Sequence, residues 1–136
     1  MKRIKNNFAL IAILTFAILG AVGSASAQAD RTPKKRLTSP AAVSGYIGGE
    51  AHDSYVIRAR KGRTLTVKIS WRRRGNNRAE FSVSRSANFY TGSVVNFGVA
   101  SNRGKHWRGT IPRTSDYYIY VVAHPTAKYT LKIKVE

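Results

Sequence analysis

A two-residue alternation of apolar and polar side chains marks the stretch from Gly45 to Trp71. At its end, the apolar side chains all fall on one face of an extended chain: Leu65, Val67, Ile69 and Trp71. This period of two is typical of a strand with one buried and one solvated face. The run from Ser54 to Arg60 alternates in the same way, and Lys61-Gly62 separates the two runs. Because glycine readily adopts a positive φ, the stretch predicts a β-hairpin.

Similar short apolar runs, separated by Gly, Pro and Asn, continue to the end of the chain: 41–47, 79–85, 94–99, 106–111, 117–123 and 129–135. No run after residue 27 has the period of 3.6 that is typical of a helix. The sequence therefore predicts an all-β fold, an antiparallel, jelly-roll-like β-sandwich of about eight strands. Lys128, just before the last run, and Lys132 and Lys134 within it alternate with apolar residues. We expect these lysines to protect an edge strand from pairing with other chains.

Residues 1–27 have the pattern of a secretory signal peptide. Three cations precede an apolar segment from Phe8 to Ala21, and the small residues of a cleavage site follow at Ala25-Ser26-Ala27. A retained membrane anchor is the alternative, but the apolar segment is shorter than the roughly 20 residues that span a bilayer. We expect a cleaved signal peptide over 1–27 and a periplasmic or extracellular location.

Residues 28–40 combine four cations with two prolines and little apolar surface. Such a segment buries too little surface to offset the entropy lost on ordering, so we expect a flexible basic arm. The arm is either a linker or a polyanion-binding segment. Residues 41–136 then form a single β-sandwich domain.

The positive charge is the most unusual bulk property of the sequence. Lysine and arginine number 24 against 6 acidic residues, a formal net charge of +18. Without the three cations of residues 1–27, 21 cations remain against 6 acids, or +15. Such a charge attracts polyanions within a Debye length of about 8–10 Å, although a merely soluble basic surface is the alternative. The chain contains no cysteine, which excludes disulfides and thiol chemistry.

Two cationic loops are candidates for a binding surface. Arg72-Arg73-Arg74 and Arg78 lie in one loop, and Arg103 and Lys105 lie in a second. Unpaired arginines must stay in solvent or meet an acidic partner, because burying an unpaired charge costs several kcal/mol. Trp71, beside the first loop, offers a ring for stacking on a sugar, a base or a guanidinium. Its place in the alternation favours an inward orientation instead.

Glu50, His52 and Asp53 place two carboxylates and an imidazole in one turn. Glu50 and Asp53 are weak candidates for metal binding, and the alternative is that the turn's own backbone and neighbouring arginines use them. No nucleophile elbow, zinc-protease motif or glycine-rich phosphate loop occurs. The sequence predicts a non-enzymatic protein with no cofactor.

Several motifs resemble the bacterial pre-peptidase C-terminal (PPC) type of β-sandwich. They are Ser44-Gly45-x-Ile47-x-Gly49, Asp53-x-Tyr55, Ala59-x-x-Gly62-x-x-Leu65-x-Val67, Trp107-x-Gly109-x-Ile111-Pro112, Asp116-Tyr117-x-Ile119-x-Val121 and Tyr129-Thr130-Leu131-x-Ile133. Together they span 41–135, and they are motifs of the scaffold. Single-domain exported members of this type include the periplasmic inhibitors of goose-type lysozyme, which this chain resembles in length, export signal and strand order.

The resemblance implies a secreted or periplasmic binding protein whose partner is a lysozyme-like muramidase. In that family, loops of the inhibitor enter the substrate cleft of the lysozyme. This chain has Arg63 where a Gln is usual and Ser115 where a Gly is usual, and no inhibitory loop matches residue by residue. Two alternatives remain open: a polyanion-binding envelope module for lipopolysaccharide, acidic glycan or nucleic acid, and a purely structural domain.

Overall fold

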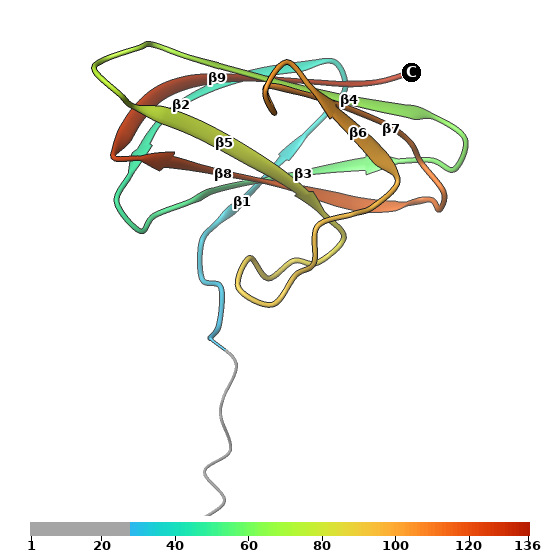
Figure 1. Ribbon diagram of the computed structural model, residues 1–136. Coiled ribbons are helices and arrows are strands. Elements are labelled where there is room, and N and C mark those ends of the chain that lie inside the picture. The colour runs from blue at the N-terminus through green and yellow to red at the C-terminus, as the bar shows by residue number, and fades with distance from the viewer. Residues whose placement is uncertain (1–27) are drawn as a thin grey trace, which may run out of the picture.

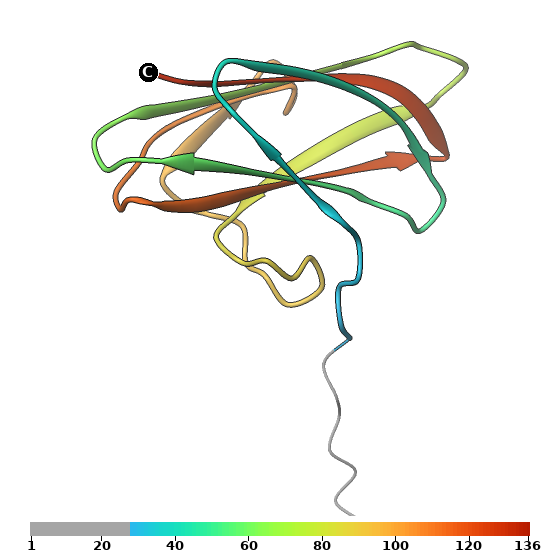
Figure 2. The ribbon, with the colours of Figure 1, turned by 180° about the vertical axis from the view of Figure 1, so that it is seen from behind.

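The computed structural model describes residues 28–136, which form two β-sheets packed face to face (Figures 1 and 2). The predicted signal peptide lies outside the described residues. The nine strands are β1 (Lys34–Leu37), β2 (Ala41–Gly48), β3 (Asp53–Ala59), β4 (Thr64–Trp71), β5 (Arg78–Ser84), β6 (Gly98–Ser101), β7 (His106–Thr110), β8 (Ser115–His124) and β9 (Thr126–Val135). Within residues 28–136, no helix is long and apolar enough to cross a membrane.

One sheet has four strands in the order β1-β3-β8-β5, and the other has five in the order β2-β9-β4-β7-β6. Every pairing is antiparallel except the parallel pair β1–β3. The predicted all-β sandwich is therefore confirmed, with nine strands where about eight were expected. Most connections carry the chain from one sheet to the other, and β6–β7 is a hairpin within one sheet.

The core lies between the two sheets and is built by the predicted alternation. On β4, Leu65 and Val67 are fully buried, whereas Lys68 on the opposite face is exposed. Strands β8 and β9 contribute most of the remaining fully buried side chains: Tyr117, Ile119, Val121, Tyr129, Leu131 and Ile133. Because alternate residues of a strand point to opposite faces, the outer face of each sheet remains available for polar side chains.

The predicted β-hairpin between 54 and 71 is wrong. Strand β3 pairs with β1 and β8, whereas β4 pairs with β7 and β9. The turn at Gly62, which has φ +86, carries the chain across the sandwich. Both strands bury their apolar faces in the same core, β3 from the four-stranded sheet and β4 from the five-stranded sheet.

The flexible arm expected at 28–40 is also wrong for much of its length. Lys34–Leu37 forms β1, which runs parallel to β3, and Leu37 is buried. Arg36 Nη2 lies 2.9 Å from Asp116 Oδ2, an ion pair between β1 and β8. Pairing with β3, a strand distant in the sequence, orders this segment. The composition of residues 28–40 alone does not indicate that β3 is available to pair with them.

Two further strand predictions need correction. Strand β9, expected at an edge, lies between β2 and β4, so its lysines line the middle of the sheet. The strand expected over 94–99 is reduced to one bridge between Val94 and Ser84, and β6 begins at Gly98. At Gly98 the backbone lies against the Trp107 ring, where a Cβ would come within 2.0 Å of ring atoms.

Candidate functional site

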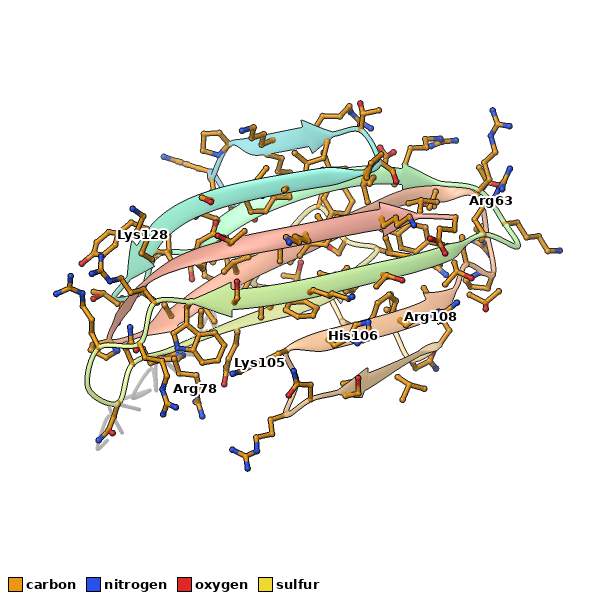
Figure 3. All side chains as sticks on the ribbon, turned by 90° about the horizontal axis from the view of Figure 1, so that it is seen from above. Arg63, Arg78, Lys105, His106, Arg108 and Lys128 are labelled. Carbon is orange, nitrogen blue, oxygen red and sulfur yellow. The ribbon has the colours of Figure 1, made fainter. Side chains whose placement is uncertain are left out.

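Two cationic loops meet at one end of the five-stranded sheet. Trp71, which ends β4, pairs with Tyr129 on β9, so the loop after β4 lies beside the start of β9. The N–H of Ile69 donates to the carbonyl of Lys105, which places the turn before β7 at the same end. Figure 3 shows Lys105 and Lys128 toward this end of the sandwich and Arg63 at the opposite end.

The loop after β4 is a preformed turn organised by Asn77. Its side-chain Oδ1 accepts from the N–H of Arg74 at 2.9 Å, and its Nδ2 donates to the carbonyls of Arg72 at 3.0 Å and Thr126 at 3.2 Å. Gly75 takes the positive φ of +59 that the turn requires. Arg72, Arg73 and Arg74 are exposed, and within residues 28–136 they form no ion pair. The turn thus presents its cations on a fixed backbone.

Trp71 is half-buried against the core, and its polar edge is used within the protein. The indole Nε1 donates to the carbonyl of Asn77 at 3.2 Å, and the Lys105 ammonium lies 4.6 Å from the ring centre. The indole thereby holds Lys105 close to the arginine loop by a cation–π contact. Trp71 consequently positions the two loops relative to one another.

The other two predicted cations differ in their surroundings. Arg103 is exposed in the β6–β7 turn with φ 55, and it makes no ion pair among the described residues. Arg78 begins β5 in the other sheet, and its Nε lies 2.8 Å from Glu80 Oε1. Arg78 is therefore already paired with an acid, although Figure 3 shows it at the same end of the sandwich as Lys105.

Sequence reasoning missed Tyr46, whose side chain is 71% exposed on β2. It lies directly opposite Lys128 in the β2–β9 ladder, and a surface groove of about 330 Å³ joins it to Arg72 and Arg74. The sequence signal that could have identified Tyr46 is an aromatic residue at an outward-facing position of the predicted strand 41–47. We name this region the cationic end and define it as Tyr46, Arg72, Arg73, Arg74, Arg103, Lys105 and Lys128.

The acidic turn does not form the constellation that its sequence suggests. His52 is buried, and its Nε2 lies 3.2 Å from Asp30 Oδ1. Asp53 Oδ2 accepts a short hydrogen bond from the Tyr129 hydroxyl, while Glu50 is exposed. Burial raises the pKa of Tyr129, and its hydrogen bonds to Asp53 and Tyr55 raise it further. No three metal-ligating side chains gather anywhere in 28–136.

No family model and no curated protein sequence matches this chain. Solved structures do. Aeromonas hydrophila PliG, a periplasmic lysozyme inhibitor of g-type lysozyme, has a TM-score of 0.62 at 21% identity, covering 79% of this chain and 100% of that chain. The fold is that of PliG. Salmonella Typhimurium PliG has a TM-score of 0.54 at 21% identity, covering 76% of this chain and 98% of its own.

The pre-peptidase C-terminal domain of a collagenase from Bacillus anthracis has the same fold as PliG and this chain. Its TM-score is 0.56 at 16% identity, covering 79% of this chain and 100% of that domain. The predicted resemblance to PPC-like domains and to PliG inhibitors is therefore confirmed at the level of the fold. Because one fold hosts unrelated functions, the function must be argued from the chain's own residues.

Proposed function

We propose that this protein is a non-enzymatic binding protein that inhibits a g-type lysozyme-like muramidase. In this proposal the cationic end enters the substrate cleft of the enzyme and excludes its glycan substrate. The observation that carries the proposal is Tyr46, which is 71% exposed and shares a groove with Arg72 and Arg74 on a scaffold with the PliG fold. We also propose that the chain is exported by residues 1–27 and acts in the periplasm.

The chemistry of the target supports this choice. Glycosidases hydrolyse their substrates with a pair of carboxyl groups, so a muramidase cleft presents acidic side chains where an inhibitor must bind. Arginine binds carboxylates with two parallel hydrogen bonds, and tyrosine and arginine are enriched at interface positions that dominate affinity. The turn fixed by Asn77 loses little conformational entropy on binding, which favours affinity.

Electrostatics restricts which muramidases qualify. With a net charge of +15 outside residues 1–27, the protein repels a strongly basic enzyme at long range and associates faster with an acidic one. The proposed target is therefore a g-type lysozyme with an acidic surface around its cleft. Inhibition is expected to weaken as salt is raised, because screening slows the encounter.

A lysis assay with the purified protein tests the proposal. We expect inhibition of an acidic g-type lysozyme at micromolar inhibitor, and we expect Arg72→Ala combined with Arg74→Ala to weaken inhibition by about tenfold or more. The matched control is Lys61→Ala combined with Arg63→Ala, which removes the same charge from the exposed turn between β3 and β4. Figure 3 shows Arg63 of this turn at the opposite end. Equal losses in both double variants would mean that net charge, and not the cationic end, governs binding. No inhibition by the wild-type protein would overturn the proposal and favour a structural domain.

A further inference from the structure

The two outer faces of the sandwich differ in charge compensation. Three of the six carboxylates lie on the side of the four-stranded sheet, and each contacts a cation there: Asp30 with Lys34, Asp116 with Arg36 and Arg58, and Glu80 with Arg78. Glu136 is the one carboxylate that lines the groove on the outer face of the five-stranded sheet, and it pairs with Lys134. Most cations on that second face have no acidic partner within residues 28–136.

Two of these unpaired lysines and a histidine form a continuous row across three strands. Lys68 on β4 lies directly opposite Lys132 on β9 in one ladder and opposite His106 on β7 in the other. Neighbouring strands are about 4.8 Å apart, and like charges directly opposite one another are destabilising. We name the row and its two flanking cations the lysine face: Lys68, His106, Arg108, Lys132 and Lys134. Figure 3 views this face, with His106 and Arg108 on β7.

A groove of about 570 Å³ lies over the lysine face. All five residues of the face line it, together with Thr66, Pro40, Ala41, Ala42 and Ile133. A second groove of about 340 Å³ shares Lys68, His106 and Lys132 and adds the hydroxyl groups of Ser70 and Thr130. The buried Nε2 of His106 makes no hydrogen bond to any described residue. The surface thus combines ammonium and hydroxyl groups above a partly apolar floor, and the unpaired imidazole nitrogen lies just beneath it.

We propose that the lysine face binds an anionic glycan, a linear polysaccharide that carries repeated carboxylate groups. Along β4, Lys68 lies between the hydroxyl side chains of Thr66 and Ser70 on the same face, which suits sugars bearing both carboxylates and hydroxyls. Lysine stems and the side chains of Pro40 and Ala42 offer apolar surface for the sugar rings. No Phe, Tyr or Trp side chain lines either groove among the described residues, whereas binders of single-stranded nucleic acid use aromatic stacking platforms.

This site adjoins the cationic end, because Lys105 also lines the second groove, but it is proposed independently of lysozyme inhibition. The arginines of the cationic end line neither groove, so each site can be altered without the other. Arg72→Ala combined with Arg74→Ala is expected to retain glycan binding, and Lys68→Gln combined with Lys132→Gln is expected to retain lysozyme inhibition. The two proposals can therefore fail separately. Absence of lysozyme inhibition with retained glycan binding contradicts only the proposed function, and absence of glycan binding with retained inhibition contradicts only the lysine face.

Titration calorimetry with oligogalacturonate, at low and at physiological salt, tests the site. We expect the affinity of the wild type to weaken as salt rises. At the same salt concentration, we expect the affinity of Lys68→Gln combined with Lys132→Gln to be at least about fivefold lower than that of the wild type. Lys61→Gln combined with Arg63→Gln is the control of equal charge and is expected to bind as the wild type does. Undiminished binding in the first double variant would overturn the proposal, as would equally tight binding of a single-stranded oligonucleotide of the same charge.

Thermal unfolding of the same variant provides a second readout. Replacing Lys68 and Lys132 removes a directly opposed pair of like charges, so the variant is expected to melt no lower than the wild type. A lower melting temperature would contradict the repulsion on which the site is argued. Loss of glycan binding with an unchanged or raised melting temperature would support the site, because misfolding could not explain the loss.

Discussion

The carboxylate of Asp30 fastens the N-terminal segment to the rest of the sandwich. Its side chain is 1% exposed and accepts hydrogen bonds from the N–H groups of Thr32 and Phe89, both at 3.0 Å. His52 Nε2 lies 3.2 Å from Oδ1, and Lys34 Nζ lies 3.6 Å from Oδ2. The Phe89 ring stacks on His52 with centroids 4.2 Å apart, so one acid joins three separate segments of the chain.

The stability that this carboxylate contributes follows from its pKa. Burial acts to raise the pKa of Asp30, but hydrogen bonds from Phe89 and Thr32 and the charges of His52 and Lys34 together lower it from 3.8 to about 2. One pKa unit corresponds to about 1.4 kcal/mol, so the ionised form contributes about 2 kcal/mol. Because the folded-state pKa is the lower one, this contribution is complete above pH 3.8 and is lost as the pH falls toward 2.

Asp30→Asn tests this reasoning by urea unfolding across a range of pH. At pH 7 we expect the free energy of unfolding to fall by about 2 kcal/mol, and we expect the loss of stability between pH 4 and 2 to be smaller in the variant. Asp116→Asn is the control, because this carboxylate is 27% exposed in ion pairs with Arg36 and Arg58 and is expected to contribute about 1 kcal/mol or less. Equal losses in the two variants, or an unchanged acid dependence in Asp30→Asn, would refute the account.

Two further substitutions test the interior, and urea unfolding measures both. Tyr129→Phe removes the hydroxyl that donates to the half-buried carboxylate of Asp53, and we expect it to lower the free energy of unfolding by about 2 kcal/mol. Tyr46→Phe is the control, because Tyr46 is exposed, and we expect it to lower the free energy of unfolding by less than about 0.5 kcal/mol. Gly98→Ala places a Cβ 2.0 Å from the Trp107 ring, and we expect a loss of about 2 kcal/mol or more because the ring must move. A wild-type unfolding midpoint in either variant would contradict the corresponding contact.

The alternation of side chains predicted the layers of the sandwich but not the neighbours of each strand. Leu65, Val67 and Ile69 were placed correctly on the buried side of β4, because their orientation depends on the strand alone. Pairing depends on distant segments. Alternation of Leu131 and Ile133 with lysines is equally compatible with an edge strand and with the central position that β9 occupies.

Charge and proline content also misled the prediction at the N-terminus. The segment around Lys34 and Arg36 looked too polar to fold, yet strand pairing with β3 and the carboxylates of Asp30 and Asp116 order it. The partners of Asp30, at His52 and Phe89, lie too far along the chain for any local pattern to connect them. Compensation of charge by tertiary contacts is not visible in composition.

The candidate site was predicted in part. Exposure of Arg72, Arg73 and Arg74 followed from the cost of burying unpaired charge, and the structure places them in solvent. Their role as a binding surface remains a prediction. The approach of Tyr46 and Lys128 to this loop could not be predicted, because it depends on the order of strands in the sheet.

Steady-state kinetics of an acidic g-type lysozyme on a soluble oligosaccharide tests the central claim most directly. If the cationic end occupies the substrate cleft, wild-type protein raises the apparent KM and leaves kcat unchanged, and Tyr46→Ala raises the inhibition constant by about tenfold or more. A fall in kcat at constant KM, or equal inhibition by the wild type and Tyr46→Ala, would contradict a cationic end seated in the cleft.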